Sequence, residues 1–158
     1  MRTPRLEIVQ LFAALMIVLT AGCGKETVNI ADTTPPQVSS TTPAPGATTV
    51  ALNTTITATF TKPMNSSTLS ATSFLVTGPG GASVTGTVTY AAAGSVATFT
   101  PAASLTYGAV YTATITTAAT DQASRANPLA ANYVWTFTSV VAPTVTSTPP
   151  RPGLRVYP

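Results

Sequence analysis

The sequence lacks the residues on which most enzyme active sites depend. It contains no histidine and a single cysteine, Cys23, among its 158 residues. Beyond Cys23, its acidic residues are Glu26, Asp32 and Asp121. Acid–base and nucleophilic catalysis need a base beside a nucleophile or two neighbouring carboxylates. We therefore expect no enzymatic activity and no cofactor, and the lone cysteine excludes an intramolecular disulfide.

Charge is also scarce, because only 7% of the residues are charged and the formal net charge is +3. The basic residues are scattered and form no run or stripe with aromatic side chains, so a nucleic-acid partner is not expected. Threonine, alanine, valine and serine are abundant instead. This composition favours β-structure with a hydroxyl-rich surface.

The first residues have the features of a bacterial signal peptide. Arg2 and Arg5 form a positive region, and residues 8–19 are mostly apolar but short for a membrane span. The segment closes on Leu-Thr-Ala-Gly-Cys at residues 19–23, which resembles a lipobox. That resemblance implies cleavage before Cys23, a diacylglycerol on its thiol and an acyl chain on its new amino group.

Two other interpretations of this segment remain open: a secretory peptide cut after Ala21 or Gly22, and an uncleaved anchor. Gly24 follows the cysteine where an aspartate would indicate retention at the inner membrane, so the resemblance implies the outer membrane of a Gram-negative cell. We predict a signal peptide over residues 1–22 and a flexible tether over 23–35, because the tether is polar and lacks periodicity.

Residues 36–139 are predicted to form one all-β domain. Short threonine- and valine-rich runs alternate with glycine, proline and asparagine clusters, which is typical of antiparallel strands in a sandwich or barrel. About seven strands is the number expected for an Ig-like antiparallel β-sandwich. The predicted strands are 37–41, 54–61, 73–77, 83–90, 96–100, 110–117 and 132–138.

Alternating side chains identify the inward face of several predicted strands, because successive residues of a strand point to opposite faces. The residues predicted to face inward are Ile56, Ala58, Phe60, Ala97, Phe99, Tyr111, Ala113, Ile115, Tyr133, Trp135 and Phe137. Thr55, Thr57, Thr59 and Thr61 should face outward. Trp135 is therefore assigned to the core rather than to carbohydrate stacking. The tyrosines at 107–111 are candidates for a tyrosine corner.

The end of the chain repeats the start of the predicted domain. Residues 143–153 match residues 36–46, with Pro, Val, Ser, Thr, Pro, Pro and Gly in corresponding places. Such a period is typical of tandem Ig-like arrays, although proline- and threonine-rich linkers also resemble one another by composition. We predict that residues 140–158 are a linker and the aborted start of a second repeat, so that the chain is the first module of a truncated protein.

Residues 36–139 resemble the SbsA-type bacterial Ig-like domain. The resemblance is carried by the opening at 36–47, by the strand and turn Ile56-Thr-Ala-Thr-Phe-Thr-Lys-Pro-Met-Asn65, and by residues 97–101, 105–115 and 133–138. One loop departs: the family often has Asp-x-Ala-Gly-Asn-x-Leu, whereas residues 121–129 are longer by two and lack the glycine. Such domains occur in surface-layer proteins, in adhesins and, often as lipoproteins, before ice-binding domains.

The sequence offers three further candidate sites by residue type. Asp121 and Asn127 offer hard oxygen ligands for a weak calcium site, but they are also typical turn residues that bond to backbone groups. Gly78-Pro-Gly-Gly81 is interpreted as a hairpin-type loop and not as a phosphate loop. The outward threonines suggest an ice-binding face, yet Ig sheets twist and threonine is a common exposed strand residue.

The sequence therefore predicts a monomeric, surface-anchored spacer or adhesion module without catalytic activity. It would contact the membrane through the lipid on Cys23, with a cell-surface protein or glycan as a further partner. The alternatives are a self-contained surface binding protein that uses its loops, and a remnant of an ice-binding protein. The expected location is the cell envelope, at the outer membrane and exposed at the surface.

Overall fold

The structure is a computed structural model that describes residues 31–145. The predicted signal peptide, Cys23 and most of the tether lie outside the described residues, as does the part of the C-terminal repeat beyond residue 145. Within the described residues, no helix has the length and apolar character needed to cross a membrane.

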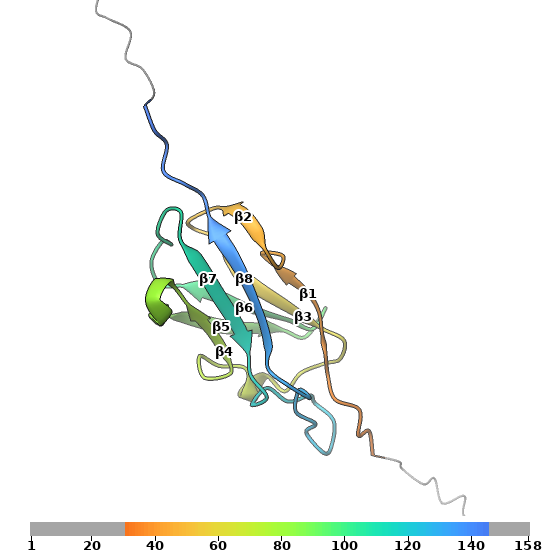
Figure 1. Cartoon of the computed structure of the whole chain (residues 1–158). Coiled ribbons are helices and arrows are strands. Elements are labelled where there is room, and N and C mark those ends of the chain that lie inside the picture. The colour runs from red at the N-terminus through yellow and green to blue at the C-terminus, as the bar shows by residue number, and fades with distance from the viewer. Residues whose placement is uncertain (1–30, 146–158) are drawn as a thin grey trace, which may run out of the picture. The chain divides into compact units, whose positions relative to one another are not determined.

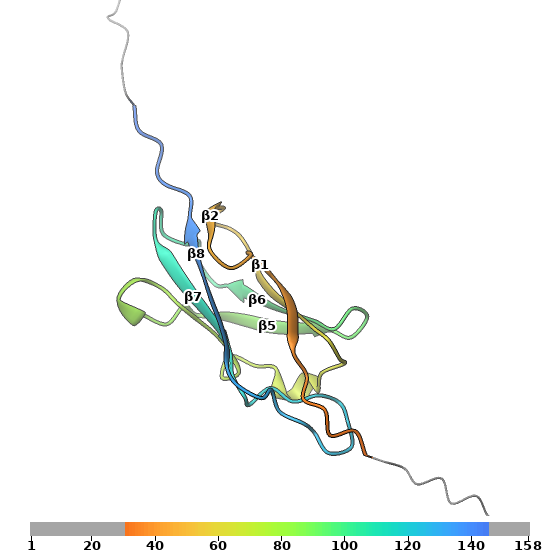
Figure 2. The ribbon, with the colours of Figure 1, turned by 45° about the vertical axis from the view of Figure 1, so that its right-hand side comes forward.

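Two four-stranded sheets pack face to face (Figures 1 and 2). One has the order β1-β3-β6-β5 and the other the order β2-β8-β7-β4. The strands are β1 (Val38–Thr42), β2 (Ala47–Val50), β3 (Ile56–Phe60), β4 (Phe74–Thr77), β5 (Gly86–Ala91), β6 (Val96–Pro101), β7 (Val110–Ile115) and β8 (Tyr133–Ser139). Two short 3₁₀ turns, η2 (Ser66–Thr68) and η3 (Pro79–Gly81), lie in the connections. This strand order matches the two sheets of an Ig-like sandwich, so the predicted fold class is confirmed.

The seven predicted strands are all present, and β2 is the one that the sequence pattern missed. β2 is short, carries Thr49 at a positive φ of 60°, and pairs with β8 irregularly through Ala47 and Val50. The pairing is parallel, whereas the other paired strands are antiparallel. An irregular four-residue strand has too little alternation to be recognised from its own sequence. It adds one parallel pairing to the predicted antiparallel sandwich.

The predicted inward residues form the core, with one partial exception. All of them are buried except Tyr133, which is half-buried where β8 begins. Phe74 occupies the middle of the core, with its ring centroid 5.8 Å from that of Phe99 and 6.0 Å from that of Trp135. Trp135 is 3% exposed, which confirms its placement between the sheets. Outward threonines of β3 are exposed or half-buried, as expected from the alternation.

Tyr111 forms the predicted tyrosine corner. Its ring is buried, and its hydroxyl accepts a 2.8 Å hydrogen bond from the backbone N–H of Thr106. Tyr107 is 52% exposed and does not take this part. Ser139 closes the same corner from β8, because its hydroxyl accepts from the N–H of Ala109 at 3.0 Å. The turn before β7 is thereby fixed to the end of β8.

Candidate functional site

The charged residues of the domain gather at one of its ends. Residues 31–145 contain only four, namely Asp32, Lys62, Asp121 and Arg125. The Lys62 ammonium lies 2.5 Å from a carboxylate oxygen of Asp32 and 3.3 Å from one of Asp121. Asn127 joins them through its side chain. We call Asp32, Lys62, Asp121 and Asn127 the Lys62 cluster.

Asp121 is the buried centre of this cluster and is only 2% exposed. Its Oδ1 accepts from the backbone N–H of Asn127 at 2.9 Å and from that of Ala123 at 3.2 Å. Its Oδ2 accepts from the Asn127 side-chain amide at 3.1 Å and from Lys62. Both carboxylate oxygens are therefore engaged by hydrogen-bond donors of the protein.

The pKa values of the three ionisable groups move in the directions that keep them charged. The hydrogen bond from Lys62 lowers the pKa of Asp32, and the same bond raises the pKa of Lys62. Burial acts to raise the pKa of Asp121, but the hydrogen bonds from Asn127, Ala123 and Lys62 outweigh it and leave this pKa below its ordinary value. An ammonium has no lone pair for nucleophilic attack, so the arrangement favours a structural role over a chemical one.

Local structure on the domain side holds Lys62 and Asp121 together. Lys62 follows β3, and Met64 pairs with Asp121 in an isolated bridge. The N–H of Gln122 donates to the carbonyl of Pro63 at 3.0 Å. The Met64 N–H donates to the Tyr90 hydroxyl at 2.7 Å, and the Met64 side chain is buried. The Lys-Pro-Met-Asn turn at residues 62–65 thus positions Lys62 next to Asp121.

The N-terminal segment is bound to this cluster, which corrects the predicted boundary of the tether. Besides its contact with Asp32, the Lys62 ammonium donates to the carbonyl of Thr34 at 2.5 Å. The Asn127 amide donates to the carbonyl of Asp32 at 2.9 Å. Residues 23–35 were predicted to be a flexible tether, but the contacts of the domain begin at Asp32. A polar segment without periodicity is predicted to be a linker. Its own sequence cannot reveal these contacts, because the residues that it binds lie far away in the chain.

The loop at residues 121–129 resolves two points that the sequence left open. Asp121 and Asn127 bond to backbone groups and to each other, as the turn interpretation predicts, and the Lys62 ammonium already provides the cation beside Asp121. Ala126 has a positive φ of 51° just before Asn127. It therefore takes the conformation for which the glycine of the family pattern is suited, and the two extra residues lie between Ala123 and Ala126.

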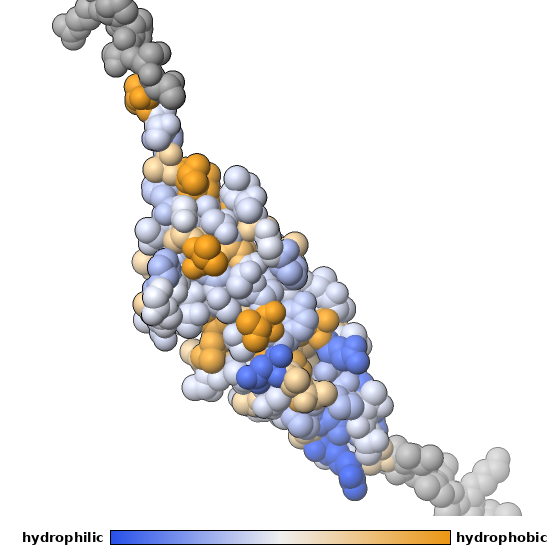
Figure 3. Space-filling view, viewed as in Figure 1, coloured by the Kyte–Doolittle hydropathy of each residue, from blue (hydrophilic) through white to orange (hydrophobic). Residues whose placement is uncertain are grey.

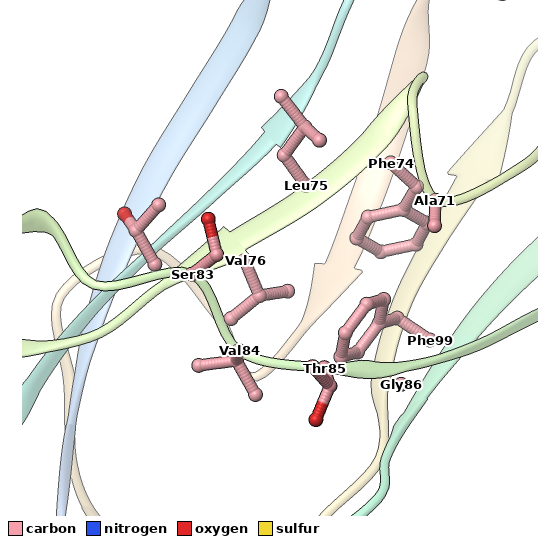
Figure 4. A pocket seen from close by; sticks show the side chains of 10 residues that line it. Ala71, Phe74, Leu75, Val76, Ser83, Val84, Thr85, Gly86 and Phe99 are labelled. Carbon is pink, nitrogen blue, oxygen red and sulfur yellow. The ribbon is translucent and has the colours of Figure 1, made fainter.

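An apolar groove of about 310 Å³ lies between edge strands β4 and β5 (Figure 4). Phe74, Val76 and Val84 contribute to its wall, and Phe99 lies beside Gly86. A Cβ on Gly86 would approach the Phe99 ring to 2.5 Å, so glycine is required there. None of the residues that line the groove is ionisable, so the groove offers apolar contact and no acid or base.

The loop after β4 begins as a hairpin-type turn, because Thr77 pairs with Ser83 in an isolated antiparallel bridge, but β4 and β5 themselves lie in different sheets. Gly78 N–H donates to the carbonyl of Ala82 at 2.8 Å, and Gly80 and Gly81 have φ values of 69° and 78°. This turn returns the chain from one sheet to the other. It precedes a strand and not a helix, so it lacks the helix N-terminus on which a phosphate loop depends.

Threonines on the outer faces of both sheets align across strands. In the first sheet the row is Thr42, Thr57, Thr98 and Thr89, and in the second it is Thr136, Thr112 and Thr77. The face seen in Figure 3 is mostly of intermediate hydropathy, with small separate apolar patches. Its most hydrophilic side chains gather toward the end where the N-terminal segment joins the domain.

The Lys62 cluster was only partly recognisable from the sequence. The residue types of Asp121 and Asn127 indicate a turn or a weak calcium site, but nothing in the sequence pattern assigns Lys62, Asp32 or Thr34 to a site. The scarcity of charge was the available signal. In a domain with so few charged residues, an acidic residue after a buried strand is expected to pair with a base, since buried charges are rarely left alone.

The strand order, the tyrosine corner and the aromatic core define an Ig-like β-sandwich. The model of the bacterial Ig-like domain family matches residues 32–139, and the chain belongs to that family. The match begins at the first residue of the Lys62 cluster. No curated protein matches the chain.

Solved structures share the fold at low sequence identity. The N-terminal part of the bacterial S-layer protein SbsC is 24% identical with a TM-score of 0.52, over 68% of this chain and 24% of that one. SbsC domains 1–6 give 23% identity, a TM-score of 0.51, and coverage of 68% of this chain but 14% of that chain. CopC from Methylosinus trichosporium OB3b is 13% identical with a TM-score of 0.55, over 70% of this chain and 98% of that one. These likenesses establish the fold.

Proposed function

We propose that this chain is a non-catalytic structural module of the cell surface, anchored to the outer membrane through lipid on Cys23. The bacterial Ig-like family and the S-layer protein among the structures with this fold support a surface module. In this proposal the lipid holds the N-terminus, and the sandwich carries the rest of the chain away from the membrane as a monomer.

The observation that carries the proposal is a repetition of the buried positions of the first strand. Around β1, Pro36 and Pro43 are buried, Val38 and Thr41 are half-buried, and Gly46 has a positive φ of 74°. The corresponding positions of the C-terminal repeat are Pro143, Val145, Thr148, Pro150 and Gly153. The positions that vary between the two copies are exposed ones in β1 and its flanks, such as Gln37, Ser39 and Ala44.

All four buried or half-buried positions of residues 36–46 recur, whereas the exposed positions are divided, since Ser40 and Pro45 recur but Gln37, Ser39 and Ala44 do not. The recurrence therefore favours a second opening strand over a linker that resembles the first by chance. It supports a tandem arrangement, in which an Ig-like module is followed by further sequence of the same kind.

The anchoring part of the proposal is tested by metabolic labelling with palmitate in a Gram-negative host. The wild-type chain should carry the label, and Cys23→Ser should lose it because the acceptor thiol is absent. Membrane fractionation of both chains should then place only the wild type in the outer membrane. Label that persists on Cys23→Ser would contradict the proposal.

A self-contained binding protein is the second candidate, and the groove between β4 and β5 favours it. Sequencing across the 3′ end of the gene separates the two candidates. A frame that continues into further Ig-like modules supports the spacer, whereas a stop codon directly after Pro158 supports the binding protein.

A further inference from the structure

The two ends of the described chain leave the domain at opposite ends (Figures 1 and 2). The N-terminal segment leads into β1, which is antiparallel to its neighbour β3. The C-terminal end follows β8, which is parallel to β2. A pull between the two ends therefore acts along β1 and β8. Because hydrogen bonds between strands lie across the strand direction, such a pull strains the bonds of each pair together, in shear.

The N-terminal side is fastened before β1 is reached. Asp32 and Thr34 are held by Lys62, and the backbone of Asp32 is held by Asn127. Next, the Gln37 N–H donates to the Thr61 hydroxyl at 3.1 Å, and the Thr61 N–H donates back to the Gln37 carbonyl at 2.9 Å. Tension from the N-terminus thus meets the Lys62 cluster first and reaches β1 only after it.

The C-terminal side is fastened on two flanks. The Val140 N–H donates to the carbonyl of Val50 on the β2 side at 2.8 Å. On the other flank, the Gly108 N–H donates to the Val140 carbonyl at 2.9 Å, and the buried Ser139 hydroxyl bonds to the turn that ends at Ala109. Just before β2, the Gly46 N–H donates to the Thr136 carbonyl of β8 at 2.7 Å.

We propose that this domain is a mechanical link that resists tension between its two ends, with β1–β3 and β2–β8 loaded in shear and the Lys62 cluster as the N-terminal latch. The cluster suits this part because it ties the incoming segment to two remote places, Lys62 after β3 and the loop at 121–127. Three of the four charged residues in residues 31–145 serve this one junction.

The proposal takes from the proposed function only the direction of pull, outward from the anchored N-terminus. Lipid anchoring and mechanical resistance are tested independently, because palmitate labelling involves no force and the force measurement below involves no lipid. A chain that is not lipidated in cells can still prove to be a strong link, and the reverse also holds.

Single-molecule force spectroscopy on residues 23–158 tests the proposal. Cys23 is the only cysteine, so a Pro158→Cys variant provides one thiol handle on each side of the described domain. The comparison chain, Cys23→Ser with Ala51→Cys and Pro158→Cys, is pulled from the exposed residue after β2 and from the C-terminal end. Because β2 and β8 are parallel, this second geometry loads the ends of both strands at Val50 and Ser139 and breaks their bonds one at a time.

Lifetime at constant force is the quantity to compare, since forced unfolding is governed by the unfolding rate. We expect the domain to stay folded severalfold longer when it is pulled from Cys23 and Pro158→Cys (the end-to-end geometry) than when it is pulled from Ala51→Cys and Pro158→Cys (the peeling geometry) at the same force. Equal lifetimes in the two geometries, or a longer lifetime on peeling, would overturn the shear link.

The latch is tested in the same instrument with Asp32→Asn, which keeps the size of an exposed side chain but removes its charge. We expect a shorter lifetime in the end-to-end geometry and no change on peeling. Arg125→Gln is the matched control. Arg125 lies in the loop at residues 121–129, beside Asp121 and Asn127 in sequence, but it forms no ion pair within residues 31–145. As a second measurement, 1 M salt should shorten the wild-type lifetime end to end but not on peeling, because it screens exposed charges. A lifetime unaffected by both Asp32→Asn and salt would remove the latch from the proposal.

Discussion

Replacing Asp121 by asparagine is expected to destabilise the domain, because Asp121 is the buried centre of the Lys62 cluster. The variant keeps the shape of the side chain and one acceptor oxygen, which can still serve the backbone N–H groups of Asn127 and Ala123. Its new amide group, however, would face the Asn127 amide and the Lys62 ammonium, which are themselves donors. Three hydrogen-bond donors would then face one another, with no acceptor where Asp121 Oδ2 now accepts from Asn127 and Lys62.

The cost follows from the two bonds lost at this buried position. Hydrogen bonds to charged groups contribute about 1.5–3 kcal/mol each. Because Lys62 keeps Asp32 as a partner, we expect a total loss of about 2–3 kcal/mol for Asp121→Asn. For Asp121→Ala, which also strands the buried N–H of Asn127, we expect about 3–4 kcal/mol. Domains of this size have only about 5–15 kcal/mol of stability in all.

Urea denaturation followed by tryptophan fluorescence measures these losses, since a change in midpoint at constant slope reports stability. Arg125→Gln is again the control and should stay within about 0.5 kcal/mol of the wild type. The effect of Asp121→Asn should depend on pH with a definite sign. Because the pKa of Asp121 is lowered below its ordinary value of 3.8, its contribution is present above that value and is lost as the pH falls through the native pKa.

At the alkaline side the sign reverses, because the pKa of Lys62 is raised above its ordinary value of 10.5. The contribution of Lys62 is complete below that value and is lost as the pH rises through the native pKa. A loss below about 1 kcal/mol for Asp121→Asn at neutral pH would refute the assignment of Asp121 as the buried centre of the cluster. A loss that is unchanged in strong acid would refute its ionised state.

Three further predictions follow from the core, the loop and the boundary. Trp135→Ala should cost about 3–5 kcal/mol by urea denaturation, as large aromatic truncations do, and an exposed tryptophan emission maximum in the wild type would contradict its burial. Ala126→Gly should raise the thermal midpoint, because glycine relieves the positive φ of 51°; a lower midpoint would count against that strain. Residues 36–139 should fold without metal, with a thermal transition unchanged by EDTA. Their thermal midpoint should nevertheless lie below that of residues 31–139, because they lack Asp32 and Thr34, which bind Lys62. Equal midpoints would show that these contacts of the Lys62 cluster do not stabilise the domain.

Alternation and turn chemistry were sufficient to predict the sandwich. A strand buried on one face must repeat with a period of two, so residues such as Ile56, Phe99 and Trp135 could be assigned to the core from the sequence. The hydroxyl bond of Tyr111 could be predicted as well, because it reaches a backbone group only five residues away. Each of these features depends on residues that are close together in the chain.

Only the tertiary structure decided the features that join distant segments. β2 gains its strand character from β8, which lies nearly a domain length away in sequence, and Tyr133 is half-buried because β8 begins at the margin of the core. The Lys62 cluster combines the N-terminal segment, the turn after β3 and the loop before β8. Local periodicity carries no information on such pairings, since their geometry exists only once the two sheets have packed.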